Sequence, residues 1–259
     1  MTGVIKMKVL SFNARCPWKD YDGINDFIHR AGFIYDKVRA EKPDVIAFQE
    51  IRNDSRELLI KMFPEYEFFG TFREENYSVE GLYTAIKKSD YVYMGCEFFW
   101  LSPTPYKIAS KFPEQSGCSR ICVMTTVRNL KTNEVFRFLN IHLDHIPGPA
   151  QINGLKCVFE FMDEYDKKNK LPTILMGDFN VRPDSETYRF AKAKEGYFDA
   201  TSAIDVTFHG FGKEAVKYDY IFLSDDLKAR VGEVTTWTDC HEGIYLSDHY
   251  PVCLEITDK

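Results

Sequence analysis

The stretch Ile-Leu-Met-Gly-Asp-Phe-Asn-Val-Arg-Pro, at residues 174–183, decides how the rest of the chain is interpreted. Three apolar residues end a predicted buried strand, and side-chain alternation along extended chain places Asp178 and Asn180 on the same side of it. Open α/β sheets carry their chemistry at the carboxyl ends of such strands. A strand end followed by an Asx turn is the plain alternative, so the interpretation depends on partners elsewhere in the chain.

The composition indicates a well-packed globular protein. Of its 259 residues, 44% are hydrophobic and 15% aromatic, and we expect residues 1–259 to form a single domain. The formal net charge of -6 argues against a broad basic surface that binds duplex nucleic acid. A local basic cluster inside a cleft could still bind phosphate.

The cysteines and the start of the chain indicate in which cellular compartment the protein is expected. Seven cysteines, odd in number and without a C-x-x-C pair, favour reduced thiols over a disulfide framework or a zinc site. The chain starts without an apolar leader, and no apolar run approaches the length of a membrane span. We therefore expect a monomeric cytoplasmic protein with no membrane span.

Hydrophobic periodicity predicts two similar units, each made of a strand, an amphipathic helix and a second strand. The first unit ends its strands at Asn13 and Glu50, and the second ends them at His142 and Asp178. This similarity suggests two alike halves whose strand ends converge on one cleft. Helices are expected at residues 24–38, 55–63, 152–165 and 185–193, further strands at 67–72, 81–86, 98–101, 120–127, 134–142, 218–223, 229–236 and 250–256, and long loops at 102–119, 205–217 and 237–248.

Polar residues follow apolar strands at six places, which makes coincidence a poor explanation. Carboxylate and amide oxygens are hard ligands, so Glu50, Asp248 and Asn13 together suit Mg²⁺ or Mn²⁺, which keep waters for a substrate phosphate. For each position taken alone, a strand-terminal turn or cap is the alternative. The six places are Asn13, Glu50, His142 with Asp144, Asp178 with Asn180, Asp219, and Asp248 with His249.

Two histidines stand beside carboxylates at predicted strand ends. His142 lies in Ile-His-Leu-Asp-His and His249 in Ser-Asp-His-Tyr-Pro. A histidine oriented by a carboxylate is typical of a proton carrier or an oxyanion donor. His145 and His209 allow either a direct role or an ordinary structural one. Some loop aromatics offer a stacking surface for a base, or simple loop packing: Tyr106, Phe112, Phe208 and Phe211.

Six short motifs follow one another along the chain: Ser-Phe-Asn at 11–13, Phe-Gln-Glu at 48–50, Ile-His-Leu-Asp-His at 141–145, Gly-Asp-Phe-Asn at 177–180, Tyr-Asp-Tyr-Ile-Phe at 218–222 and Ser-Asp-His-Tyr-Pro-Val at 247–252. Their residues and their order resemble the motifs of the endonuclease/exonuclease/phosphatase superfamily, which has the deoxyribonuclease I-like fold. Phe-Trp-Leu-Ser at 99–102 and Thr-Phe-His-Gly-Phe at 207–211 are similar to a bacterial branch of that superfamily. The resemblance spans nearly the whole chain.

The resemblance implies an α/β fold, a four-layer sandwich of two packed mixed β-sheets flanked by helices. It also implies cleavage of phosphate esters that depends on Mg²⁺ or Mn²⁺. Glu50 would be the principal metal ligand, and Asn13 and Asp248 would complete or orient the site. Asp178 would orient or deprotonate the attacking water, and Asn180 would position it against phosphorus.

The remaining roles implied by the resemblance concern the phosphate. His249, held by Asp219, would contact a non-bridging oxygen, and His142 would do likewise or assist the leaving group. The positions that match phosphate contacts in the family, or are further candidates for substrate binding, are Arg52, Arg120, His145 and His209. The chemistry is coherent, because a phosphodiester repels anionic nucleophiles and needs cationic groups and one base for in-line attack.

We therefore expect a divalent-metal-dependent phosphoesterase, and within that class a phosphodiesterase. The substrate stays open between short nucleic acid, a phospholipid head group, and an inositol phosphate or other small ester, so a lipid or inositol phosphate phosphatase is an alternative to a nuclease. A non-catalytic binding module with the same fold would be expected to have lost Asp178 or Glu50. A binuclear metallophosphoesterase would need an early Asp-x-His and a Gly-Asn-His motif, which the sequence lacks.

Overall fold

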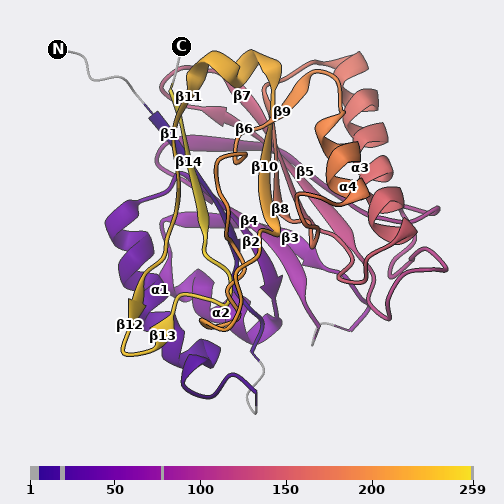
Figure 1. The fold of residues 1–259 in the computed structure, drawn as a ribbon. Coiled ribbons are helices and arrows are strands. Elements are labelled where there is room, and N and C mark those ends of the chain that lie inside the picture. The colour runs from indigo at the N-terminus through magenta and orange to yellow at the C-terminus, as the bar shows by residue number, and fades with distance from the viewer. Residues whose placement is uncertain (1–5, 18–20, 77–78, 258–259) are drawn as a thin grey trace.

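A computed structural model of the protein describes residues 6–17, 21–76 and 79–257. Two six-stranded sheets pack face to face, with helices on both outer faces (Figure 1). This is the four-layer α/β sandwich that the sequence led us to expect. The helices are α1 (Phe27–Glu41) and α2 (Asn53–Met62) on one side, and α3 (Pro149–Lys168) and α4 (Glu186–Lys192) on the other.

The two sheets have the same internal arrangement. In each sheet the third and fourth strands are parallel, and every other neighbouring pair is antiparallel. The two halves inferred from the spacing are therefore present as equivalent sheets. The first sheet runs β11 (Val231–Thr236), β14 (Val252–Thr257), β1 (Lys6–Asn13), β2 (Val45–Ile51), β4 (Gly81–Lys87) and β3 (Tyr66–Phe72). The second runs β5 (Tyr91–Trp100), β6 (Ile121–Asn129), β7 (Val135–His142), β8 (Thr173–Asp178), β10 (Asp219–Ser224) and β9 (Tyr197–Asp199).

The space between the sheets is filled by apolar side chains from both halves. Val9, Val45, Phe138 and Met176 belong to one fully buried cluster there. The central strands also bury their outer faces under helices, which is why they are continuous apolar runs rather than alternating ones. Separate clusters lie under α1 and α2 and under α3 and α4.

A pair of buried amides joins the sheets. Gln49 on β2 donates from Nε2 to Oδ1 of Asn140 on β7 at 2.8 Å, and Asn140 Nδ2 donates to the carbonyl of Phe48 at 3.0 Å. Buried polar groups are stable only when paired, so these bonds hold one relative position of the two sheets.

The helix expected at residues 24–38 begins three residues later, because Gly23–Asn25 forms a separate 3-10 turn, η1. The carboxylate of Asp26 then caps α1 by accepting the Ile28 amide at 3.2 Å. α1 ends where Lys42 adopts a left-handed φ of 51°, before Pro43.

The loop expected at residues 237–248 contains a small hairpin, β12 (Cys240–His241) and β13 (Ile244–Tyr245). Together with β9 and the 3-10 turn η2 (Asp225–Arg230), these elements were not predicted, because two to six residues are too few to display a period. In the part of the chain that the structure describes, no helix combines the length and apolar character needed to cross a bilayer.

Candidate active site

Strand register brings three of the expected residues side by side. His142 on β7 lies opposite Asp178 on β8, and Asp178 lies opposite Asp219 on β10. Because β7 and β8 are parallel and β10 runs the other way, two strand ends and one strand start meet at the same edge of the second sheet. The first sheet contributes Asn13 at the end of β1 and Glu50 near the end of β2.

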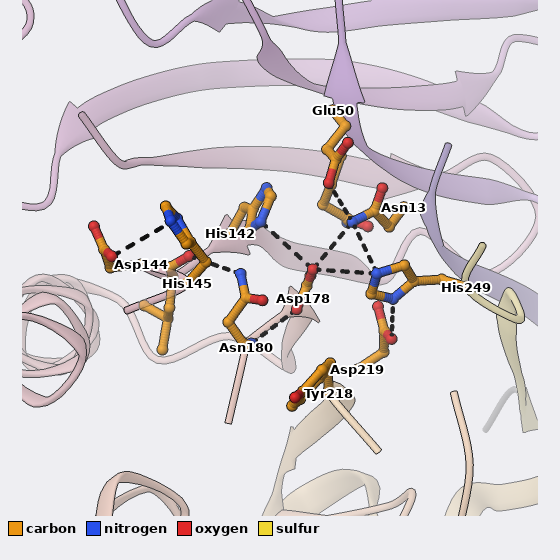
Figure 2. Close-up of polar contacts among 12 residues, drawn as sticks. Asn13, Glu50, His142, Asp144, His145, Asp178, Asn180, Tyr218, Asp219 and His249 are labelled. Atoms are coloured by element: carbon orange, nitrogen blue, oxygen red, sulfur yellow. Dashed lines mark hydrogen bonds and ion pairs between the residues drawn. The ribbon is translucent and has the colours of Figure 1, made fainter. Parts of the chain in front are cut away.

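Asp178 lies at the centre of this cluster, with Asn13, His142 and His249 pointing toward it (Figure 2). Its Oδ2 accepts a hydrogen bond from Asn13 Nδ2 at 3.0 Å. The same oxygen lies 3.4 Å from His142 Nε2 and 3.7 Å from His249 Nε2. Its Oδ1 accepts the backbone amide of Asn180 at 2.8 Å, so both carboxylate oxygens are held.

Gly177 allows β8 to approach β7 closely enough for this arrangement. Its φ of 146° is unusual for an L residue, and a Cβ atom at this position would lie 1.9 Å from the carbonyl oxygen of Ile141. Only glycine fits here, so the residue before Asp178 is fixed by backbone contact rather than by chemistry.

Glu50 reaches the site through a local irregularity of β2. The pairing of β2 with β4 shifts register between Phe48 and Ile51, and Glu50 has a left-handed φ of 59°. A bulge of this kind re-aims a side chain. Glu50 Oε1 then accepts Asn13 Nδ2 at 3.0 Å, and Oε2 accepts the Cys16 amide at 3.1 Å.

His249 is held as a cation. Its Nδ1 lies 2.8 Å from Oδ2 of Asp219. Burial disfavours the charged ring, but the carboxylates of Asp219 and Asp178 outweigh burial and raise the pKa of His249 to about 10. The imidazolium therefore persists at neutral pH with its Nε2 directed at Asp178.

The other two central groups are shifted in different directions. Burial, helped by the negative charge of Asp219 and opposed by His249, raises the pKa of Asp178 to about 7. Burial, with the positive charges of Arg120 and Arg73, lowers the pKa of His142 well below its usual value. Near pH 7 the site thus holds one cationic imidazole, one neutral imidazole and one carboxyl group poised to exchange a proton.

A cavity of about 930 Å³ opens over these strand ends. Asn13 and Asp219 lie behind its wall, where they hold Asp178 and His249. The structure brings most of the expected residues together in the wall: Glu50, Arg52, Arg120, His142, His145, Asp178, Asn180, Asp248 and His249.

Two of the expected phosphate contacts come from the walls of the cavity. Arg120 is buried, and its Nη2 lies 3.1 Å from His145 Nδ1. Its Nε lies 3.9 Å from Asp144 Oδ2, and neither Nε nor Nη1 has a hydrogen-bond partner among the residues that the structure describes. Arg52 donates from Nη1 to the Pro17 carbonyl at 3.1 Å. Asp144, expected beside His142, is instead tied to the Ser116 hydroxyl at 2.7 Å and supports the loop.

His209 does not line the cavity. It is buried, its ring stacks on Tyr250 with centroids 4.0 Å apart, and its Nδ1 accepts the Gly212 amide at 3.1 Å. Burial and the positive charge of His249 lower the pKa of His209 to about 4, which keeps it neutral. Its contacts brace the loop expected at residues 205–217 rather than reach toward a substrate.

The loop aromatics divide in the same way. Phe208 and Phe211 line the cavity, and the Phe208 ring lies 4.9 Å from that of His249. Tyr106 instead bonds Glu97 at 2.9 Å, and Phe112 packs against the cluster under α3 and α4.

Sequence reasoning missed five charged residues of the wall: Arg15, Asp22, Arg73, Glu80 and Lys213. Glu80 Oε2 pairs with Arg73 Nη1 at 2.7 Å, and burial together with Glu50 raises the pKa of Glu80. The sequence could have indicated Glu80. Because β4 is antiparallel to β2, a residue just before β4 lies at the same edge of the sheet as Glu50, near the end of β2. Arg15 stands two residues beyond Asn13.

The donor atoms around Glu50 suit a hard divalent cation. Among the described residues, ligand atoms lie within 4.8 Å of one another in two groups that include Glu50: one with His142 and Asp178, the other with Cys16 and Glu80. Asp248 joins neither group and lies 3.6 Å from Arg15 Nε.

Asn13 is arranged to orient carboxylates. Its Nδ2 faces both Glu50 and Asp178, while its Oδ1 accepts the Arg15 amide at 3.0 Å. Burial opposes ionisation of Glu50, but Arg15 and the hydrogen bonds from Asn13 and the Cys16 amide lower its pKa, which keeps a carboxylate ready for a cation.

This combination of a two-sheet sandwich and a cluster of carboxylates, amides and histidines at the strand ends defines a class of phosphoesterases. The Endonuclease/Exonuclease/phosphatase family matches residues 10–249, and the chain belongs to it. Members of this family are phosphoesterase hydrolases. No curated protein matches the chain.

Solved structures agree with this membership. An endonuclease/exonuclease/phosphatase family protein from Bacteroides thetaiotaomicron is 25% identical with a TM-score of 0.87, covering 99% of both chains. A mannosyl-6-phosphatase from the same organism is 25% identical with a TM-score of 0.86, covering 96% of this chain and 98% of its own. A protein from Enterococcus faecalis is 26% identical with a TM-score of 0.85, covering 97% and 100%.

Proposed function

We propose that this protein is a Mg²⁺- or Mn²⁺-dependent phosphodiesterase that acts by in-line attack of a water held by Asp178 and Asn180. The observation that carries the proposal is the state of Asp178. Its carboxyl group lies at the floor of the cavity beside a cationic histidine, and its pKa is raised to about 7. A base is most effective when its pKa is near the working pH.

The attacking water is handled by two neighbours on the chain. Asn180 has a left-handed φ of 52°, and its Nδ2 donates to the Leu143 carbonyl at 3.1 Å, so the amide is fixed beside Asp178. Asp178 accepts the proton of the water, and Asn180 holds the oxygen in line with phosphorus. Fixed orientation of this kind removes much of the entropic cost of attack.

The charge of the phosphate is met by imidazolium and guanidinium groups. His249 contacts a non-bridging oxygen through Nε2, because its Nδ1 is engaged with Asp219. Arg120, whose Nε and Nη1 have no hydrogen-bond partner among the described residues, contacts another oxygen through its guanidinium group. Neutral His142 assists the leaving group. Preorganised donors of this type stabilise charge that develops in the transition state.

Glu50, with Asp248 completing the site and Asn13 orienting it, would hold the cation. When bound, Mg²⁺ or Mn²⁺ supplies positive charge to the phosphate and its leaving oxygen. The site fits such an ion because carboxylate oxygens of Glu50 and Asp178 lie within 4.8 Å of each other and of a His142 ring nitrogen, at the edge of an open cavity.

The substrate that we propose is a small phosphodiester or the end of a short nucleic acid, processed by a monomeric cytoplasmic enzyme. The rings of Phe208, Phe211 and Tyr218 line the cavity and offer a stacking surface for a base. A second candidate is a phosphomonoesterase acting on a sugar phosphate, which is favoured by the similarity to the mannosyl-6-phosphatase over nearly the whole chain.

A hydrolysis panel with Mg²⁺ and Mn²⁺ tests the proposal. The substrates are bis(p-nitrophenyl) phosphate, single-stranded RNA and DNA, sphingomyelin, inositol phosphates and mannose 6-phosphate. We expect diester turnover, with Asp178→Asn lowering kcat by about 10³-fold, in the range found for general bases. His249→Ala should also reduce turnover, and the exposed Asp184→Asn serves as the matched control.

Each outcome of the panel has a meaning. Turnover of monoesters alone favours the second candidate. No turnover with either metal, or equal rates for Asp178→Asn and the parent protein, would overturn the catalytic proposal and favour a binding module.

A further inference from the structure

The side chain of Arg30 on α1 is completely buried, and within the part of the chain that the structure describes all of its hydrogen-bond partners are main-chain carbonyls. Its Nε donates to Asn25 at 2.6 Å, and its Nη2 donates to Arg15 at 3.0 Å. Its Nη1 donates to two carbonyl oxygens, that of Ala14 at 3.0 Å and that of Leu246 at 2.6 Å. The exposed fraction of Arg30 is 0%. One guanidinium group thus joins three separate stretches of backbone.

One of these stretches carries residues of the proposed metal site. Ala14 and Arg15 directly follow Asn13, and their neighbour Cys16 donates its amide to Glu50 at 3.1 Å. The left-handed φ of 53° at Arg15 lets the chain turn there, and the carbonyl of that residue is one that Arg30 holds.

Another of these stretches approaches from the other end of the chain. Leu246 stands two residues before Asp248, and its carbonyl receives the Arg30 Nη1 donor. The hairpin of β12 and β13 that precedes it lies against α1 and η1 (Figure 1). Arg30 therefore connects the backbone after Asn13 with the backbone before Asp248, which are more than 200 positions apart in the chain.

The chemistry of the side chain matches this task. Arginine carries five N–H donors in one rigid plane, whereas lysine concentrates its donors on one flexible nitrogen. Burial lowers the pKa of Arg30 to about 10, against the nearby carboxylates of Asp248 and Asp22. A desolvated cation that donates its hydrogen bonds to carbonyls and lies with its Cζ 5.5 Å from the Phe27 ring centroid is a costly way to fill space, since an apolar side chain would do so at lower free energy.

We propose that Arg30 is a positioning residue of the metal site. By fixing the carbonyls of Ala14, Arg15 and Leu246, it sets the separation between Asp248 and the pair formed by Asn13 and Glu50. The affinity for Mg²⁺ or Mn²⁺ depends on that separation. This inference rests on the metal-dependent function proposed above and adds a residue that touches neither metal nor substrate.

Manganese affinity tests the proposal without any substrate. The dissociation constant for Mn²⁺ is measured by the electron paramagnetic resonance signal of the free ion, for the parent protein, Arg30→Lys and Arg30→Gln. Each protein is measured at a temperature well below the midpoint of its own thermal unfolding. We expect the constant to rise about tenfold or more in both variants, as is typical when a group that orients ligands is lost.

Arg137→Lys is the matched control. Arg137 is also buried, with an exposed fraction of 2%, and it donates to Asp166 at 2.6 Å and to the Asn169 carbonyl at 2.9 Å. It lies on β7 five residues before His142, which is roughly 17 Å away along the strand. We expect Arg137→Lys to lower the unfolding midpoint while leaving the Mn²⁺ constant unchanged.

The outcomes separate this inference from the proposed function. Equal Mn²⁺ constants for the parent, either foldable Arg30 variant and Arg137→Lys would overturn the positioning role and leave Arg30 as a residue of the core. An absence of Mn²⁺ binding by the parent itself would overturn the metal-dependent function, and this inference with it.

Discussion

At the scale of single residues, the site is defined by protonation states that neighbouring charges produce. Asp219 supports the cationic state of His249, and burial raises the pKa of Asp178 to about 7. The distances that matter join residues far apart in the chain, such as Asn13 and Asp178, separated by 165 positions. The pairing of Asp219 with His249 therefore has consequences for both stability and activity.

Replacement of Asp219 by asparagine should change the pH dependence of stability. The folded pKa of His249, about 10, exceeds the unfolded value of about 6.5. Its stabilising contribution is thus fully present below about pH 6.5 and is lost as the pH rises toward 10. In Asp219→Asn the folded pKa falls, so we expect the alkaline loss of stability to shrink.

Urea unfolding at pH 6, 8 and 10 measures this effect. The difference between parent and variant should narrow as pH rises, whereas the exposed Asp226→Asn should follow the parent at every pH. Parallel curves for the parent and Asp219→Asn would contradict the charged state assigned to His249.

Much of the site could be predicted from residue types at strand ends, including Glu50, Asp178 and His249. The sequence left open whether His145 and His209 reach the cavity, and only His145 lines it. His209 and His249 both lie in distinctive motifs, yet the ring of His209 is occupied by the Gly212 amide and by Tyr250. Such contacts depend on how a loop closes, which residue types alone do not determine.

At the scale of elements, β8 depends on one glycine for its fit against β7. Adding a methyl group in Gly177→Ala forces a Cβ atom against the Ile141 carbonyl in an unfavourable φ. We expect this variant to lose about 3 kcal/mol or more of unfolding free energy, since strained backbone alone costs 1 to 3 kcal/mol.

Gly32→Ala is the matched substitution in the opposite direction. Gly32 lies within α1, and a Cβ atom there would meet no other part of the described chain within 4 Å. Alanine should raise the unfolding free energy by about 0.5 to 1 kcal/mol, because glycine is a poor helix former. Denaturant titration of both variants checks the pair, and a tolerated Gly177→Ala would refute the close approach of β7 and β8.

Apolar runs predicted the central strands because those strands are buried on both faces. They did not predict the bulge at Glu50, since a left-handed residue near the end of a strand follows from pairing with β4 rather than from local sequence. The hairpin of β12 and β13 was missed because it has two residues on each side. The local sequence pattern thus predicts long buried elements, but it fails where pairing with a distant strand determines the backbone conformation.

At the scale of the whole molecule, the equivalence of the two halves was visible in the spacing of Asn13, Glu50, His142 and Asp178. That the halves form separate sheets packed face to face came from family resemblance, because spacing alone does not say which strands pair. The Gln49–Asn140 bond is part of this packing and could not be predicted, since nothing in the sequence relates these two residues to each other.

A bound metal ion should stabilise the whole fold. At a Mn²⁺ concentration 100 times the dissociation constant, binding adds about 2.7 kcal/mol, which raises Tm by roughly 5 to 10 °C for a chain of this size. Glu50→Gln should abolish the shift, whereas Glu160→Gln on the exposed side of α3 should preserve it. Calorimetry with and without EDTA measures the shift, and an equal rise in Glu50→Gln would place the ion elsewhere.

The division of the site between two sheets has a consequence for folding. Asn13 and Glu50 come from one sheet and His142 and Asp178 from the other, so neither sheet alone holds a working set. During refolding, secondary structure can form in either half before any substrate is turned over. The rate at which activity recovers therefore measures how fast the two halves dock, which is the last step of assembly.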